Sequence, residues 1–163
     1  MEKKVIYGGQ GDFEAKQVDE GKFKYSKHIV TPKYNTQQHV SFMEVPPKAF
    51  AFPYHYHLGI TESYVILSGK AEVLTPEGVV SLNAGEVIVF PPGETGAHRL
   101  QNASDSEPLR YVDIDTTSVP DVINYPHSKK IAYTAGKISE GCWKISDTVD
   151  YYYGEDKTQE DSH

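Results

Sequence analysis

Cysteine is almost absent from this sequence of 163 residues, in which Cys142 is the only one. A single cysteine excludes both a disulfide within the chain and the paired-cysteine sites of structural zinc. The chain also lacks the run of about 18 apolar residues that a membrane-spanning helix requires. Its start, MEKKVIYGG, has no apolar core of the kind found in signal peptides. We therefore expect a cytoplasmic protein that does not enter a membrane.

Positive charge is in short supply. The chain has 16 Lys and Arg residues against 23 Asp and Glu residues, which gives a formal net charge of −7. Nucleic acids and anionic membrane surfaces repel such a chain at long range. Neither is an expected partner.

Helical periodicity is also missing, whereas short runs of strand-forming residues recur between turns rich in Gly and Pro. This pattern predicts an all-β barrel or sandwich. The length suits one domain with one core. We expect a core barrel over about residues 38–115, an extension over 116–153 and a mobile acidic tail over 154–163. The expected strands are residues 4–7, 23–30, 38–45, 64–67, 70–75, 79–82, 86–90 and 109–115.

Two histidines stand out in the stretch HYHLGITESYVILSG, residues 55–69. His55 and His57 are two residues apart, so on an extended strand both imidazoles leave the same face, with Cα atoms about 6.5 Å apart. That separation suits two rings that bind one metal ion. Residues 58–61 can turn the chain and bring Glu62 beside them. A third histidine, His98, follows a turn at Pro91-Pro92-Gly93.

These residues resemble the two motifs of the cupin family. The pattern HxH(x)4E(x)6G resembles the first motif, and the second is matched by Gly85, Pro91, Gly93, His98 and Asn102. Two features depart from the family pattern: Ala49 replaces the usual glycine, and the loop between Gly93 and His98 is two residues longer. An even insertion preserves strand parity, so His98 can still face inward.

The resemblance implies a small jelly-roll barrel, the double-stranded β-helix, with one divalent metal ion inside. The ligands that it implies are His55, His57, Glu62 and His98. Imidazole and carboxylate ligands are compatible with Zn, Mn, Fe, Ni or Cu, so the metal stays open. Tyr64 shares the strand face of Glu62 and is a candidate general base, although a core aromatic is the alternative interpretation.

Two classes of function remain open. One is a metal-dependent enzyme that acts on a small polar molecule such as a sugar phosphate or a hydroxy or keto acid, either as an isomerase or epimerase or as a dioxygenase. The other is a cupin that binds a small ligand without catalysis. The segments YPHSKKIAY and DTVDYYYGE of the extension loosely resemble the tails of cupins likened to sugar-phosphate isomerases.

The extension is expected to be irregular apart from one possible strand at residues 129–134. It carries six large aromatic residues, which should pack on the barrel or on a partner subunit and limit access to the barrel opening. Such a surface, together with strands that precede the motifs, predicts a homodimer. The six aromatic residues are Tyr125, Tyr133, Trp143, Tyr151, Tyr152 and Tyr153.

Overall fold

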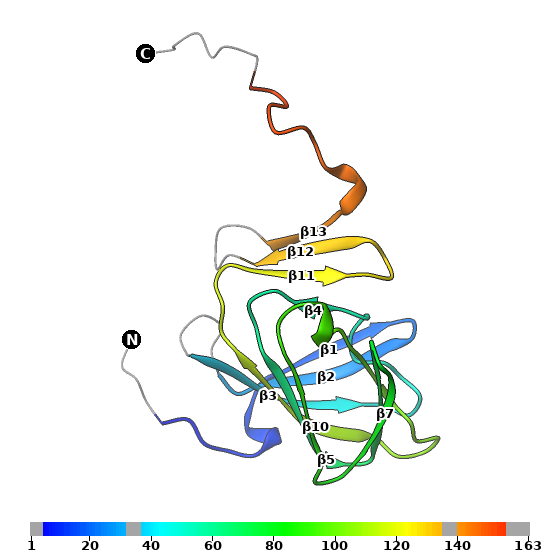
Figure 1. The fold of residues 1–163 in the computed structure, drawn as a ribbon. Helices are drawn as coiled ribbons and strands as arrows, with labels where there is room; N and C mark the ends of the chain where they lie inside the picture. The colour runs from blue at the N-terminus through cyan, green and yellow to red at the C-terminus, as the bar shows by residue number, and fades with distance from the viewer. Residues whose placement is uncertain (1–4, 32–36, 135–139, 156–163) are drawn as a thin grey trace.

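The computed structural model describes residues 5–31, 37–134 and 140–155. Within these ranges the chain consists of β-strands joined by turns (Figure 1), so the predicted all-β fold is confirmed. The helical segments there are three-residue 3-10 turns, and none of them could span a membrane. They are η1 (Gln10–Asp12), η2 (Glu94–Gly96) and η3 (Ile145–Asp147).

Most strands lie where the residue pattern predicts them. The prediction of a strand at residues 4–7 is wrong for residues 5–7, which form no strand because no neighbouring strand pairs with them. Lys4 lies outside the described residues. The strands are β1 (Ala15–Glu20), β2 (Phe23–Ile29), β3 (Gln38–Val45), β4 (Tyr56–His57), β5 (Glu62–Ser68), β6 (Lys70–Thr75), β7 (Gly78–Asn83), β8 (Val87–Phe90), β9 (Arg99–Asn102), β10 (Leu109–Thr116), β11 (Asp121–Tyr125), β12 (Lys130–Thr134) and β13 (Glu140–Lys144).

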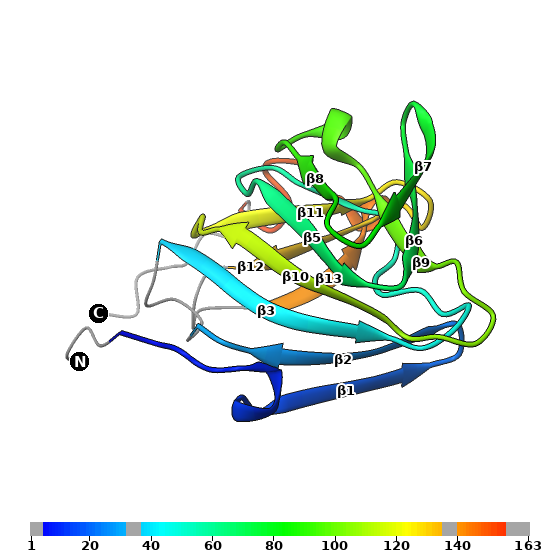
Figure 2. The same cartoon turned by 90° about the horizontal axis from the view of Figure 1, so that it is seen from below.

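Two sheets form the barrel. The larger has the order β1-β2-β3-β10-β5-β8, and Figure 2 shows these strands side by side. The smaller has the order β7-β6-β9. Neighbouring strands in both sheets are antiparallel. β10 pairs with β3 along one edge and with β5 along the other, so it lies in the interior of the larger sheet. The side chains on its inward face therefore point into the core of the barrel.

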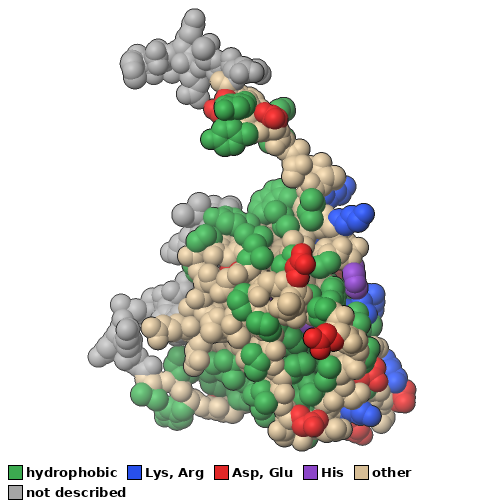
Figure 3. All heavy atoms as spheres, in the orientation of Figure 1, with side chains coloured by type: hydrophobic (Ala, Val, Ile, Leu, Met, Phe, Trp, Pro, Cys, Tyr) green, Lys and Arg blue, Asp and Glu red, His purple; other side chains and the backbone are tan. Residues whose placement is uncertain are grey.

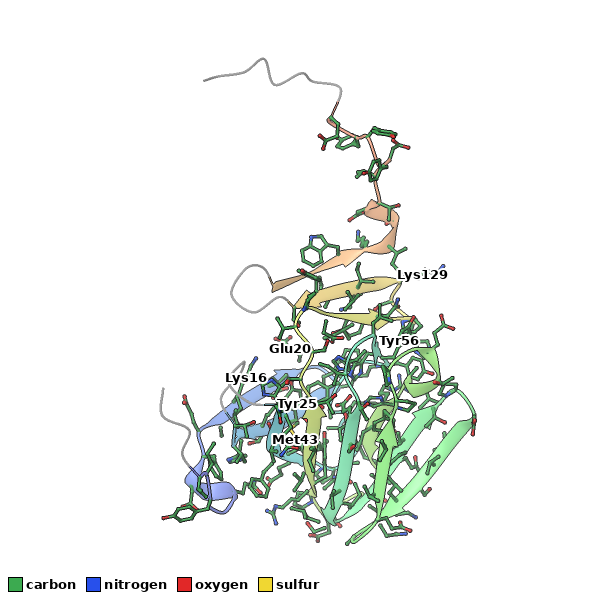
Figure 4. The ribbon with its side chains drawn as sticks, turned by 60° about the vertical axis from the view of Figure 1, so that its left-hand side comes forward. Lys16, Glu20, Tyr25, Met43, Tyr56 and Lys129 are labelled. Atoms are coloured by element: carbon green, nitrogen blue, oxygen red, sulfur yellow. The ribbon has the colours of Figure 1, made fainter. Side chains whose placement is uncertain are left out.

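Alternating side chains from both sheets fill the core. Along β5 and β10 buried positions alternate with more exposed ones, as expected for strands with one face on a core. Complete burial of a side chain such as Ile66 or Leu109 contributes about 1.5–3 kcal/mol to stability. Tyr25 and Met43, labelled in Figure 4, come from β2 and β3, so the N-terminal hairpin also contributes to this core.

The extension is more regular than the residue pattern indicates. It contains β11, β12 and β13, of which only β12 is predicted, and these strands form a sheet in the order β13-β12-β11-β4. The short strand β4 links this sheet to the barrel, because His57 pairs with Ile123 and Tyr56 with Asn124. Tyr56 lies at this junction in Figure 4. Residues 156–163, most of the expected mobile tail, lie outside the described part.

Gly69 makes the tight turn between β5 and β6 possible. Its φ is +84°, and a Cβ there would lie 2.9 Å from the Pro108 carbonyl oxygen. We expect Gly69→Ala to lower the free energy of unfolding by about 1–3 kcal/mol, because it adds backbone strain and a steric contact. Denaturant unfolding measures the change. Gly11→Ala is the matched control, since nothing lies within 4 Å of its added Cβ. Equal stability of the two variants would contradict this account.

Candidate metal centre

Backbone pairing brings the two histidine segments together. His55 and His98 form an antiparallel bridge in which each backbone N–H donates to the other's carbonyl, at 3.1 and 2.9 Å. Glu62 begins β5, where it pairs with Phe90 on one side and Asp115 on the other. Segments separated in the sequence thus place imidazole and carboxylate groups at one end of the barrel interior.

The side chains converge on the carboxylate of Glu62. The distances from its Oε2 are 3.1 Å to His98 Nε2, 3.7 Å to His55 Nε2 and 3.8 Å to His57 Nε2. His55, Glu62 and His98 are buried, and one ligand atom from each lies within 4.8 Å of the others. His57 also points its Nε2 at Glu62, although it stands outside this tightest group.

Each histidine is oriented through its other ring nitrogen. Nδ1 of His55 lies 2.8 Å from the Pro53 carbonyl oxygen, and Nδ1 of His98 lies 2.9 Å from the Gly96 carbonyl oxygen. Nδ1 of His57 lies 2.6 Å from Asp121 Oδ2. Because these oxygens only accept, each Nδ1 carries the proton, and in the neutral ring Nε2 keeps its lone pair for the site. This is the typical arrangement around histidines that bind a metal.

The longer loop before His98 folds into η2 without displacing the histidine. Gly96 is required there because a Cβ would collide with the carbonyl oxygen of Pro91. The His98 ring stacks on Phe90, with centroids 3.6 Å apart and an interplanar angle of 10°. Loop backbone and ring packing therefore fix His98 on both sides.

Burial and neighbouring charges set the protonation states. Burial lowers the pKa of His55 to about 4, so its ring is neutral at pH 7. Burial opposes charge on His57, but the hydrogen bond to Asp121 and the charge of Glu62 outweigh it and raise its pKa. Burial likewise disfavours the Glu62 carboxylate, yet the surrounding histidines hold its pKa below the usual value. The site is therefore an ionised carboxylate among nitrogen ligands.

These residues fit a metal ion. Glu62 Oε2 is buried and has no hydrogen-bond partner, although three imidazole nitrogens face it. An unpartnered buried carboxylate oxygen is costly, and a cation bound between it and the imidazole lone pairs would satisfy all of them. The group formed by His55, Glu62 and His98 could therefore hold a metal ion.

Tyr64 lies directly beside this group. Its hydroxyl donates to Glu62 Oε1 at 2.6 Å and lies 3.1 Å from His98 Nε2. Burial and the charge of Glu62 raise its pKa well above the usual value, so the phenol stays neutral. A neutral phenol donates a proton or orients a neighbour. A role for Tyr64 in catalysis stays a prediction, and this protonation state favours it as a donor rather than as a base.

The extension supplies a residue that the sequence analysis does not identify. Asp121, at the start of β11, accepts from His57 Nδ1 through Oδ2 and from the Gly59 backbone N–H at 2.8 Å through Oδ1. Tyr125 follows on the same strand face, with its ring centroid 6.0 Å from that of His55. Lys130 in turn places its Nζ 4.7 Å from the Tyr125 ring centroid. The extension therefore covers part of the site.

Comparison with known proteins agrees with this geometry. Residues 41–115 match the family model described as the cupin domain. They contain all four predicted ligands and the barrel strands from most of β3 to nearly all of β10. This part of the chain is a cupin domain. No curated protein matches the chain by sequence similarity.

Solved structures share the fold over most of the chain. A sugar phosphate isomerase of the cupin superfamily from Silicibacter pomeroyi has a TM-score of 0.74 at 16% identity, over 85% of this chain and 92% of that one. A protein from Acidithiobacillus ferrooxidans, provisionally named a sugar phosphate isomerase, has a TM-score of 0.65 at 20% identity, over 77% and 80%. A polyketide cyclase from Streptomyces resistomycificus has a TM-score of 0.55 at 23% identity, over 72% and 81%. At these identities the likeness shows the fold.

The bond between Asp121 and His57 provides a test of the centre. Asp121→Asn keeps the size of the side chain but replaces one acceptor with a donor, so it cannot satisfy both His57 Nδ1–H and the Gly59 N–H. We expect Zn²⁺ affinity to fall about 10- to 100-fold while the fold is retained. Competition with a chelator measures the affinity, and circular dichroism checks the fold. Asp19→Asn, at an exposed ion pair with Lys24, is the control. An unchanged affinity in Asp121→Asn would exclude this role.

Proposed function

We propose that this chain binds one divalent metal ion through His55, His57, Glu62 and His98 and is an isomerase- or epimerase-like enzyme for a small polar substrate. The observation that carries the proposal is the buried convergence of imidazole Nε2 atoms on the unpartnered Oε2 of Glu62. Nδ1 acceptors hold each ring in place. A site with no ligand to bind would not require such orientation.

The metal, when bound, would polarise a carbonyl or hydroxyl oxygen of the substrate. The chain itself would exclude water and hold protons at defined atoms. Tyr64 keeps its proton on the hydroxyl beside Glu62 and His98. The wall of β11, with Asp121 and Tyr125, limits the size of molecule that reaches the site.

A sugar phosphate or a hydroxy or keto acid is the proposed substrate class. Support comes from the shared fold with the Silicibacter pomeroyi sugar phosphate isomerase and from the polar side chains that gather around Glu62. Arg110 is exposed and paired with Glu44 at 2.7 Å, which makes it a poor candidate for an anionic group of the substrate. Lys130, above Tyr125, is a better candidate.

Metal content is the first prediction of this proposal. The double variant His57→Ala/His98→Ala should retain little metal, whereas wild-type protein incubated with Zn, Mn, Fe or Ni should retain about one ion per chain. Metal binding should weaken as pH falls through the raised pKa of His57 and be lost as pH approaches the pKa of His55, about 4, because the ligands must be deprotonated. Elemental analysis after gel filtration decides the matter. Equally low metal in both proteins would refute the site.

Activity is then tested on the metal-loaded protein with sugar phosphates, hydroxy acids and keto acids. Proton exchange at carbon, followed by NMR in D₂O, indicates isomerase or epimerase chemistry when it is absent from the double variant. Oxygen consumption with Fe but not with Zn would instead indicate a dioxygenase. Ligand-dependent thermal stabilisation without turnover would indicate a binding protein.

We propose further that the chain is a homodimer. β13 is an edge strand of its sheet, and exposed apolar side chains follow it. Figure 3 shows hydrophobic side chains on the segment that projects from the barrel. Tyr151 is 88% exposed, and Tyr152 and Tyr153 are exposed as well. The expectation that the aromatic residues of the extension pack on their own barrel is therefore wrong for these three tyrosines. The exposed apolar residues of β13 and of the described segment after it are Trp143, Ile145, Val149, Tyr151, Tyr152 and Tyr153.

Light scattering should therefore give twice the chain mass of 18.2 kDa at micromolar concentration. Deletion of residues 145–163 removes most of the exposed apolar surface but leaves β13, and it should shift the mass toward that of one chain. A wild-type mass near 18.2 kDa would contradict the dimer. A dimer that survives the deletion would remove this segment from the interface.

A further inference from the structure

A second polar group lies inside the barrel, next to the candidate metal centre. Tyr111, Asp113 and Asp115 alternate along β10 with Val112 and Ile114, so the three share one face. We call them the β10 cluster. In the pairing with β5, Asp115 lies opposite Glu62 and Asp113 opposite Tyr64. The cluster therefore continues the polar surface of the candidate metal centre along the neighbouring strand.

The hydrogen-bonding capacity of the β10 cluster is incomplete. Tyr111 is fully buried and Asp113 is 2% exposed. The hydroxyl of Tyr111, Oδ1 of Asp113 and Oδ1 of Asp115 are all buried without a hydrogen-bond partner. Buried polar atoms in native proteins are nearly always paired, so three unpartnered atoms on one face require an explanation. Burial and the neighbouring carboxylates raise the pKa of Asp115 to about 9, so at neutral pH the set has two groups that can donate, the Tyr111 hydroxyl and the Asp115 carboxyl, and one carboxylate that only accepts, Asp113.

A second metal ion is a weak explanation. The carboxylates of Glu62, Asp113 and Asp115 each place an oxygen within 4.8 Å of the others, which is a spacing that a cation could use. Lys27 already supplies a cation, because its Nζ lies 2.9 Å from Asp113 Oδ2. A divalent ion among the same oxygens would be repelled by this ammonium group.

An anionic ligand group is equally disfavoured. The ionised carboxylates of Glu62 and Asp113 outnumber Lys27, and the Tyr111 ring lies 4.7 Å from that of Tyr64, so aromatic and acidic groups surround the position. A phosphate or carboxylate would meet repulsion there. Hydroxyl groups are different, since each can donate to a carboxylate and accept from the phenol of Tyr111.

We propose that the β10 cluster binds adjacent hydroxyl groups of a small polyhydroxylated molecule whose other end reaches the group formed by His55, Glu62 and His98. The proposal rests on the proposed function, and it deepens that function by assigning the hydroxylated end of the substrate to this face. Asp115 is only partly buried and the Lys27 side chain is 25% exposed, so the outer end of the cluster lies near the surface. An anionic end would then lie away from the β10 cluster.

The test uses metal-loaded full-length protein and two uncharged probes of equal carbon length, xylitol and 1,5-pentanediol, which lacks the three inner hydroxyls. NMR titration gives both affinities. Wild-type protein should bind xylitol at least about tenfold more tightly. Tyr111→Phe, which removes only the hydroxyl, should abolish this preference, and so should Asp113→Asn. The exposed control Asp19→Asn should keep it. A wild type without preference, or a Tyr111→Phe variant that keeps it, would overturn the assignment.

Thermal unfolding without ligand separates a ligand site from a water site. If the Tyr111 hydroxyl is unpartnered, Tyr111→Phe should leave the Tm unchanged or raise it. A clear fall in Tm would mean that ordered water already satisfies the hydroxyl, which would also overturn the assignment.

Metal content, measured in parallel, separates this assignment from the proposed function. Wild-type protein that holds metal and turns over sugar phosphates, but shows no Tyr111-dependent preference for xylitol, would refute the β10 cluster alone. A Tyr111-dependent preference in protein that takes up no metal would refute the metal site alone.

Discussion

Burial of negative charge is the constraint on which the rest of this structure depends. Glu62, Asp113 and Asp115 bring three carboxylates together in a barrel interior where repulsion is weakly screened. Burial and the charge of Asp113 raise the pKa of Asp115 to about 9, so Asp115 is protonated at neutral pH. Lys27 pairs with Asp113, and three imidazoles surround Glu62. Lys27 comes from β2, far in the sequence from the β10 carboxyl group that it pairs with.

This charge balance ties the strands before the cupin motifs to the barrel interior. β2 carries Lys27 into contact with Asp113, and β1 pairs along the other edge of β2. Removal of one member of a buried ion pair is far more destabilising than loss of an exposed pair. The N-terminal hairpin therefore maintains the interior as well as extending the sheet.

The resemblance to the two cupin motifs was sufficient to predict the four candidate ligands. Strand periodicity and turn residues, which act over a few positions, were sufficient to predict most barrel strands. The supporting residues could not be predicted in this way. Asp121 is 64 residues from His57, and Lys27 is 86 residues from Asp113. The alternation at Tyr111, Asp113 and Asp115 shows a strand, but polar residues in a strand usually face water, and here they face inward. The extension was harder still, since prolines flank β11 at both ends; they bound the strand without interrupting it.

The hydrogen bond between Asp121 and His57 would couple metal binding at the candidate centre to the attachment of β11 to the barrel. A metal ion bound at Nε2 of His57 would require the ring proton to stay on Nδ1 and would make that N–H a stronger donor to Asp121, so it would also strengthen the attachment of β11. By thermodynamic linkage, a molecule that pulls β11 away must weaken metal binding by the same factor. A molecule that binds the outer strands of the extension and displaces β11 would therefore change how firmly the candidate centre holds a metal ion.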